Sequence, residues 1–143
     1  MGYSADGNKI LAGCADGSLQ IFDGKHNHHR PELMVRKAHV PSEDYSSIVG
    51  FRDVTKFATR NTDGTMKVWD LRNFTRPVFH DRELPNRFPG NKMCLSPDGK
   101  YLLVGTAVGQ GIEEPESYVH FYDTGSLERV KSLTIGGSSV CGL

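Results

Sequence analysis

The chain has 143 residues, of which 37% are hydrophobic and 24% charged, with 16 glycines and 7 prolines. This length suits one domain with its own core, and the glycine and proline content favours a turn-rich β protein over a helical one. The 17 basic residues balance the 17 acidic ones, so no net charge attracts nucleic acid or an anionic membrane surface. No apolar run approaches the ~20 residues of a membrane helix. We therefore expect neither a membrane nor a direct nucleic-acid partner.

Strand-like segments follow one another along the chain, and no stretch has convincing helical periodicity. Residues 1–4 are expected to hold the tail of a strand. Hairpin turns are predicted at the four Asp-Gly pairs because such turns need a positive φ, which carries no Cβ penalty in glycine. These pairs are Asp6-Gly7, Asp16-Gly17, Asp63-Gly64 and Asp98-Gly99. The strands predicted around them lie within residues 9–15, 16–23, 32–38, 56–61, 63–70, 76–81, 100–108, 116–123 and 129–135.

Two kinds of internal repeat are visible along the chain. The segments "DGSLQIFD" (16–23) and "DGTMKVWD" (63–70) match each other, and "ESYVHFYD" (116–123) keeps the strand without the Asp-Gly pair. The segments "SADGNKILAG" (4–13) and "SPDGKYLLVG" (96–105) also match over their whole length. The final aspartates of the first three segments are 47 and 53 residues apart. This period indicates a repeat architecture with four strands in each unit.

The repeats resemble those of WD-repeat β-propellers, whose units run to about 40–45 residues with four strands per blade. Trp69-Asp70 carries the signature dipeptide, and Phe22-Asp23 and Tyr122-Asp123 carry aromatic variants of it. The resemblance implies an all-β fold of about three antiparallel blades, as a partial propeller. We expect an incomplete blade at 1–40, blades at 45–84 and 91–135, and the start of another at 138–143. A ring of 4–8 blades is usual, so we expect either a segment of a longer protein or two chains that close one ring, with self-association through open blade edges.

The resemblance also implies a buried structural tetrad in the middle repeat. In this family the tryptophan of the third strand bonds a hydroxyl on the second, which reaches a histidine and the turn aspartate. Here these residues are Trp69, Thr59, His39 and Asp63. The first repeat has Ala12 at the hydroxyl position, and the third lacks the turn aspartate. A catalytic triad made of Asp63, His39 and Thr59 is the less favoured interpretation, because a buried indole N–H needs these partners.

The segment 57–72 resembles the Trp-Asp-x-Arg box through which some WD-repeat proteins dock on the adaptor of cullin-4 ubiquitin ligases. The resemblance implies partner-binding roles for Asp70 and Arg72, whose guanidinium offers planar, permanently charged donors. The segment departs from the box at Arg60 and Asn61, where small residues are usual. The alternative is that Arg72 is a solvated charge after a strand.

Two further segments are candidate sites. Residues 84–90, "LPNRFPG", present Arg87 and Phe88, which are of types enriched in interface hot spots; packing of Phe88 between blades is an equal alternative. The histidines of 24–32 lack the carboxylate or thiolate that usually completes a metal site, so a polar loop is expected there. No nucleophile–base pair, metal spacing or phosphate loop is present, and we expect a non-catalytic protein without metal or cofactor.

The segments 3–23, 62–78, 84–90 and 95–111 resemble the gastrulation-defective branch of the WD-repeat family. That resemblance implies a nuclear, or nuclear and cytoplasmic, protein-interaction scaffold. It is expected to act as a cullin-4 ligase receptor in the DNA-damage response, or in an RNA-processing or chromatin complex without a ligase role.

Overall fold

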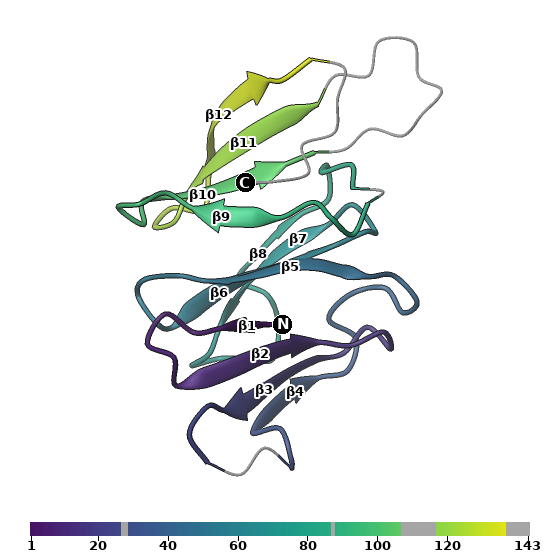
Figure 1. Cartoon of the computed structure of the whole chain (residues 1–143), viewed down its shortest axis with the longest axis vertical. Helices are drawn as coiled ribbons and strands as arrows, with labels where there is room; N and C mark the ends of the chain where they lie inside the picture. The colour runs from purple at the N-terminus through teal and green to yellow at the C-terminus, as the bar shows by residue number, and fades with distance from the viewer. Residues whose placement is uncertain (27–28, 87, 107–116, 137–143) are drawn as a thin grey trace.

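The computed structural model describes residues 1–26, 29–86, 88–106 and 117–136, and these residues form strands and no helix. The strands make three antiparallel sheets of four (Figure 1). The first sheet contains β1 (Gly2–Tyr3), β2 (Lys9–Gly13), β3 (Leu19–Asp23) and β4 (Leu33–Val35). The second contains β5 (Tyr45–Gly50), β6 (Lys56–Asn61), β7 (Met66–Asp70) and β8 (Phe79–Asp81). The third contains β9 (Met93–Leu95), β10 (Tyr101–Gly105), β11 (Tyr118–Asp123) and β12 (Arg129–Thr134).

Strand order within each sheet follows the chain, and the sheets are stacked on one another (Figure 1). The first strand of the middle sheet, β5, contacts the first strands of both neighbours, β1 and β9. The fourth strand of each sheet lies at the opposite edge from the first. This arrangement confirms the predicted all-β fold, a partial WD-repeat propeller of about three blades. Within the described ranges no helix is present that would reach across a membrane.

The Asp-Gly turns are formed as predicted. Gly64 has a φ of +80°, and the Asp63 carboxylate accepts a hydrogen bond from the Thr65 backbone N–H at 2.9 Å. Gly17 has a φ of +77° in the matching turn of the first sheet, where the Asp16 carboxylate accepts from the Ser18 N–H at 2.9 Å. Since only glycine takes this backbone conformation without strain, the repeated Asp-Gly pair sets the register of each hairpin.

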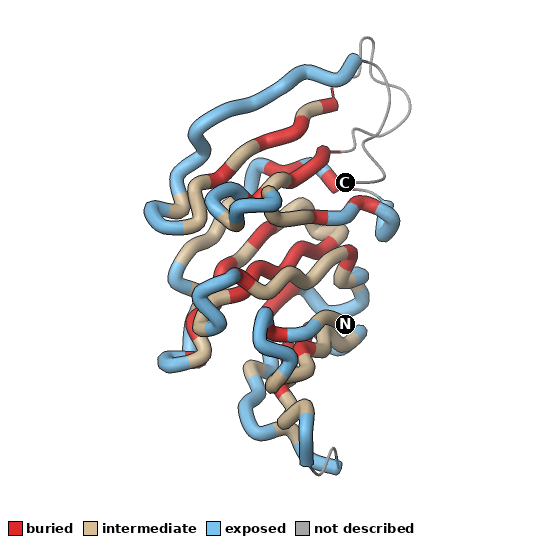
Figure 2. The backbone as a smooth tube through the Cα atoms, turned by 60° about the vertical axis from the view of Figure 1, so that its left-hand side comes forward, coloured by how far each residue is buried: buried red, intermediate tan, exposed pale blue. Residues whose placement is uncertain are grey.

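Two hydrophobic clusters join the three sheets. The cluster between the first and second sheets consists of Leu11, Leu19, Ile21, Ala38, Phe57, Trp69 and Phe74. The cluster between the second and third sheets consists of Phe51, Ala58, Met66, Val68, Leu84, Met93, Leu102, Val104 and Tyr122. Neighbouring residues of β6 and β7 therefore contribute to opposite clusters, as the two-residue period of a strand requires. Figure 2 shows the result: buried backbone gathers in the middle, and β12 is exposed along its whole length.

The stacked sheets have two rims. The first rim is made of the hairpins at 4–8, 51–55 and 96–100 together with the turns after Asp23, Asp70 and Asp123. Each turn is bonded to its hairpin, from Gly24 N to Asn8 O, from Leu71 N to Thr55 O and from Thr124 N to Lys100 O. The second rim contains the hairpins at 14–18 and 61–65 and the connections 36–44 and 82–92. There Ala38 N bonds Gly17 O, and Leu84 N bonds Gly64 O.

Two predicted fourth strands are shorter than the pattern indicated. Residues 36–38 do not extend β4, because the backbone turns to the 14–18 hairpin. β8 begins at Phe79 and not at residue 76, since Pro77 lacks the N–H that a ladder needs. The predicted blade limits remain predictions, and residues 138–143 lie outside the described residues.

Candidate functional site

The four residues of the predicted tetrad form one chain of contacts in the middle sheet. Trp69 donates from Nε1 to Thr59 Oγ1 at 2.9 Å, and Thr59 Oγ1 lies 2.8 Å from His39 Nε2. His39 Nδ1 lies 3.5 Å from Asp63 Oδ2 and 2.9 Å from Thr65 Oγ1. Thr65 in turn donates from its hydroxyl to Asp63 Oδ1 at 2.7 Å. Thr65 was not among the predicted residues, although its position after Asp-Gly matches the small polar residue of the repeat.

The partners indicate which atoms carry hydrogen. Trp69 Nε1 can only donate, so Thr59 Oγ1 accepts from it. The Asp63 carboxylate can only accept, which places the imidazole hydrogen of His39 on Nδ1 and leaves Nε2 to accept from the Thr59 hydroxyl. Burial lowers the pKa of His39 despite the nearby Asp63 carboxylate, so the imidazole is neutral at pH 7. Burial alone would raise the pKa of Asp63, but hydrogen bonds from His39 and Thr65 outweigh it and hold that pKa well below its usual range.

This group holds the sheet together and offers no reactive atom to solvent. The side chain of His39 is 0% exposed and that of Asp63 8% exposed. The side-chain donors of the tetrad and of Thr65 have acceptors inside the protein, as a purely structural group requires. Among the described residues, no three histidine, cysteine, aspartate or glutamate side chains gather in a way that would hold a metal. His28 of the histidine loop lies outside those residues.

The other two sheets use different contacts at the same position. Phe22 faces Ile10 across the ladder, and its side chain has no polar atom that needs a hydrogen-bond partner. Tyr122 is buried and donates its hydroxyl hydrogen to Asp81 Oδ2 at 2.6 Å, across to the middle sheet. Arg129 also donates to Asp81, from Nη2 at 2.8 Å. At this position the aromatic residue of the third sheet, Tyr122, bonds to the middle sheet, whereas Trp69 bonds to a residue of its own sheet.

Arg72 is held at the first rim by the residue two positions before it. Its Nε lies 3.0 Å from Asp70 Oδ1 and its Nη2 lies 2.6 Å from Asp70 Oδ2, so the guanidinium donates to both carboxylate oxygens. The bonds from Arg72 lower the pKa of Asp70 to about 2 and raise that of the guanidinium. The Arg72 side chain is 69% exposed, whereas that of Asp70 is 11% exposed.

The turn that carries Arg72 is anchored by the core. Asn73 N donates to Asp70 O at 3.1 Å, and Phe74 is buried with its ring 5.6 Å from the Trp69 ring. Trp69 therefore fixes the turn from below while Asp70 orients the arginine above it. The result is an exposed cation in one defined position.

Arg60 and Asn61, the two departures from the expected box, are fully buried. Arg60 donates from Nη1 to Gly105 O and from Nη2 to Pro85 O, the latter at 3.4 Å. These contacts tie β6 to the third sheet and to the connection between the two sheets. The departures therefore serve the packing of sheets at the second rim, far along β6 and β7 from Arg72.

The segment 84–90 places its predicted contact residues differently. Phe88 is 42% exposed, so its side chain is not tucked between blades. Arg87 lies outside the described residues. The flanking Asn86 and Asn91 are buried and bonded to each other, from Asn91 Nδ2 to Asn86 Oδ1 at 2.8 Å. The prediction did not include these asparagines, although each stands at one end of the "NRFPGN" stretch.

The comparisons with known proteins agree with this geometry. Residues 1–23 match the model of the family described as "WD domain, G-beta repeat". Over 96% of its length the chain is 38% identical to WD repeat-containing protein 70 of Xenopus tropicalis. The chain is a WD-repeat protein. Over the same share it is 35% identical to WD repeat-containing protein 70 of Homo sapiens and 34% identical to Gastrulation defective protein 1 homolog of Drosophila melanogaster.

This WD-repeat protein covers only part of those relatives. The chain spans 22% of the Xenopus protein and 21% of each of the other two, which is about a fifth of their length. The similarity therefore supports the predicted branch of the WD-repeat family. It does not by itself assign the activity or partners of the whole proteins to this chain. WD repeats generally mediate contacts between proteins, and the buried tetrad and exposed arginine suit that use.

Proposed function

We propose that this chain is part of a non-catalytic protein-interaction scaffold that docks through Arg72 on the adaptor of a cullin-4 ubiquitin ligase. One observation supports this above the others. The Arg72 guanidinium is 69% exposed, yet Asp70 holds it in place through both carboxylate oxygens. A cation oriented in this way loses little conformational freedom when a partner binds it.

The chemistry of the proposed contact follows from the guanidinium. Nε and Nη2 donate to Asp70, and the side chain is still 69% exposed, so the guanidinium has further N–H groups to offer a partner. A partner that presents backbone carbonyl or carboxylate oxygens would receive charge-assisted hydrogen bonds there. Lysine would not reproduce the contact, because its ammonium is a point charge without the fork.

Binding of the purified adaptor to the chain tests the proposal. We expect Arg72→Ala to weaken binding by about tenfold or more, as for an arginine hot spot. Arg76→Ala is the matched control, because Arg76 is an exposed arginine of the same turn and is expected to bind like the wild type. Both variants should keep the wild-type melting temperature, since both side chains are exposed. Equal affinity of wild type and Arg72→Ala would end the proposal.

The cellular role that we propose with this docking is that of a substrate receptor linked to the DNA-damage response in the nucleus, or in nucleus and cytoplasm. Its support is the similarity to the gastrulation-defective branch together with the exposed arginine. Microscopy of the tagged protein, before and after DNA damage, is the direct measurement. Exclusion from the nucleus under both conditions would contradict this role.

The alternative is a scaffold in an RNA-processing or chromatin complex without any ligase contact. Arg60 and Asn61 favour it, because they depart from the docking box and serve the junction between sheets. Mass spectrometry of proteins recovered with the intact protein separates the two functions. Splicing or chromatin components without ligase subunits would favour the alternative.

A further inference from the structure

Thr75 is an exposed threonine in the turn that carries Arg72. The Thr75 hydroxyl donates to Asn73 Oδ1 at 3.0 Å, which holds it beside the residue that follows Arg72. Arg76 comes directly after Thr75 and is also exposed. Three residues of chain span at most about 10 Å, so both arginine side chains can reach a charged group carried by Thr75. An uncharged hydroxyl therefore lies between two exposed cations.

The backbone around Thr75 is open, although a neighbouring side chain anchors the turn. Phe74 is 8% exposed and packs on the Trp69 ring, so the turn keeps its place on the core. Within the part of the chain that the structure describes, residues 74–77 form no backbone–backbone hydrogen bond. An enzyme that modifies a side chain must hold the backbone around it. This segment can be held without breaking a strand ladder.

The other exposed serines and threonines of the described residues lack such surroundings. They are Ser42, Ser126, Ser132 and Thr134. Ser42 and Ser126 have carboxylates close by in the chain, which would repel a phosphate. Ser132 and Thr134 belong to β12, whose backbone is paired with β11, so an enzyme would have to open the ladder to hold them.

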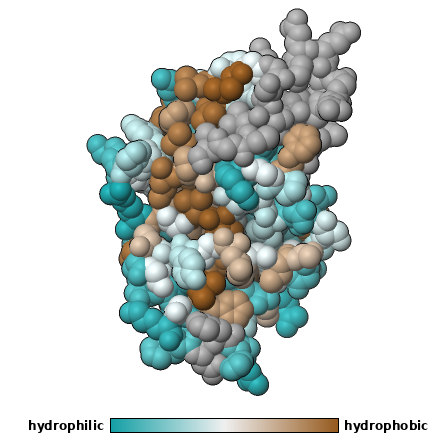
Figure 3. Space-filling view, in the orientation of Figure 1, coloured by the Kyte–Doolittle hydropathy of each residue, from teal (hydrophilic) through white to brown (hydrophobic). Residues whose placement is uncertain are grey.

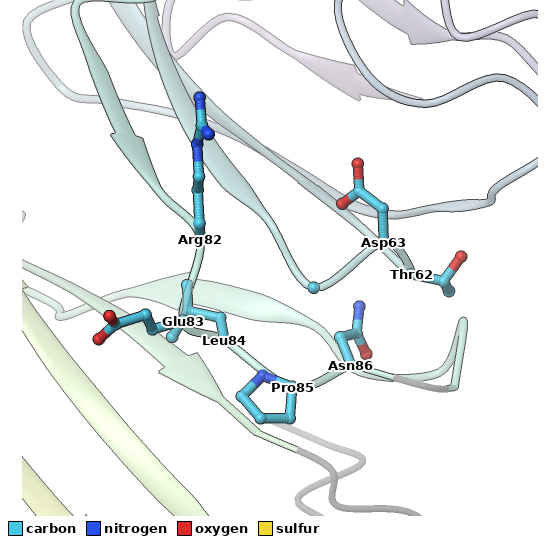
Figure 4. A pocket seen from close by; sticks show the side chains of 8 residues that line it. Thr62, Asp63, Arg82, Glu83, Leu84, Pro85 and Asn86 are labelled. Carbon is cyan, nitrogen blue, oxygen red and sulfur yellow. The ribbon is translucent and has the colours of Figure 1, made fainter.

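A threonine and an arginine also border the hollow of about 420 Å³ on the second rim (Figure 4). These residues are Thr62 and Arg82, but the Asp63 carboxylate borders the same hollow. The Thr62 hydroxyl moreover donates to the Glu43 carboxylate at 2.7 Å. A phosphate on Thr62 would face these negative charges, whereas the turn at 71–77 contains no acidic residue.

We propose that Thr75 is a phosphorylation site and that its phosphate occupies the N–H groups through which Arg72 docks. This inference rests on the docking function proposed above and names its regulation. Asp70 is bonded to Arg72 Nε and Nη2, and within the described residues Nη1 forms no hydrogen bond. A phosphate brings a charge of about −1.5 to −2 and three acceptor oxygens, which suit the guanidiniums of Arg72 and Arg76. Phosphorylation of Thr75 thus blocks binding of the adaptor.

The modification is a phosphoryl transfer from a nucleoside triphosphate, catalysed by a protein kinase. Thr75 Oγ1 attacks the γ-phosphorus, and the bond from that phosphorus to the oxygen shared with the β-phosphorus breaks. The hydroxyl hydrogen passes to the catalytic carboxylate of the kinase, and the nucleoside diphosphate leaves. A phosphatase transfers the phosphoryl group to water and restores docking.

Mass spectrometry tests whether the modification occurs. The intact protein is recovered from cells treated with phosphatase inhibitors, and its phosphopeptides are sequenced. We expect a phosphate on Thr75 that is lost in Thr75→Ala. Wild-type protein without phosphate at Thr75 under these conditions would overturn the proposal.

The contact between phosphate and arginine is tested without the adaptor. Phosphothreonine is incorporated at position 75 of the whole chain and, as a matched control, at Thr134, which lies at the end of β12. Titration followed by ³¹P NMR gives the second pKa of each phosphate. We expect that pKa at position 75 to lie below the usual value of about 6, because nearby cations favour the dianion. Arg72→Ala should raise it, and a value that Arg72→Ala leaves unchanged would overturn the proposed contact.

Binding of the purified adaptor tests the regulation. We expect phosphothreonine at position 75 to weaken binding by about tenfold or more and phosphothreonine at position 134 to leave it unchanged. Thr75→Ala should bind like the wild type, because it leaves Arg72 and Asp70 in place. Equal affinity with and without phosphate at position 75 would overturn this inference. A wild-type chain that does not bind the adaptor would instead overturn the proposed function, and the titration would still decide whether the phosphate contacts Arg72.

Discussion

Arg60 of β6 donates from its guanidinium to the backbone carbonyl oxygen of Gly105 at the end of β10. The arginine is fully buried, and its hydrogen-bond partners are the carbonyls of Gly105 and Pro85, without a carboxylate. Burial lowers the pKa of the guanidinium to about 10, which still leaves it charged at pH 7. A buried cation thus joins the second and third sheets through neutral acceptors.

Replacing this arginine should loosen the junction of the two sheets. We expect Arg60→Ala to lower the free energy of unfolding by about 2–4 kcal/mol, because a cavity forms and the two carbonyls lose their donor. Arg60→Met fills the space without a buried charge and is expected to cost about 1 kcal/mol or less. Urea unfolding of the three proteins measures the difference. Similar losses for both variants would mean that the hydrogen bonds matter more than the volume.

Trp69 should contribute more to stability than any exposed residue of the same turn. Trp69→Ala removes a buried indole that packs on Phe74 and is expected to lower the free energy of unfolding by about 3–5 kcal/mol. Trp69→Phe keeps a ring but loses the bond to Thr59, for which we expect about 1–2 kcal/mol. Thermal or urea unfolding distinguishes the two, and a cost below that of Trp69→Phe for the alanine variant would contradict the packing argument.

Asp70 should affect docking through Arg72. We expect Asp70→Ala to weaken adaptor binding by roughly three- to tenfold, because the guanidinium loses both acceptors and becomes free to rotate. Asp53→Ala is the control, since Asp53 is a carboxylate of the same rim that pairs with Lys56. The adaptor-binding assay gives both values. Stronger binding by Asp70→Ala would mean that Asp70 competes with the partner for Arg72.

Stability should fall on acidification. Burial lowers the pKa of His39, so below about pH 6.5 the unfolded chain binds more protons than the folded one and the free energy of unfolding decreases. The depressed pKa of Asp63 adds a further loss below about pH 4. We expect the melting temperature to drop between about pH 7 and 5. His39→Gln should show a smaller drop, and a slope equal to that of the wild type would show that His39 is not responsible.

The third sheet should make the chain associate at high concentration. All six residues of β12 are exposed, and Val130, Leu133 and Ile135 expose between 40% and 53% of their surfaces. Figure 3 shows apolar surface in this upper part of the molecule. Open edges of this kind pair with other chains. We expect light scattering to report species larger than a monomer, and Leu133→Lys to reduce them. A monomer at every concentration would contradict this expectation.

Much of the fold could be predicted because its signals are local. An Asp-Gly pair selects a hairpin wherever it occurs, and alternation over five residues fixes which side of a strand faces the core. Trp69-Asp70 and its two aromatic variants mark the same position in each unit and so indicate the repeat. The contact from Trp69 to Thr59 joins neighbouring strands of one hairpin, so a repeat pattern is enough to propose it. The role of Thr65 could not be predicted, because a hydroxyl in a turn has many possible partners.

Contacts between sheets could not be read in this way, since they join residues far apart in the chain. Arg60 was recognised only as a departure from the expected box, and its bond to Gly105 depends on how the second and third sheets stack. The exposure of Phe88 and the asparagines beneath it depend on the same stacking. Strands, turns and the repeat follow from the amino-acid sequence because they rest on neighbouring residues. Which side chains bridge the sheets and which stay exposed depends on how the sheets pack, because burial is a property of the packed sheets.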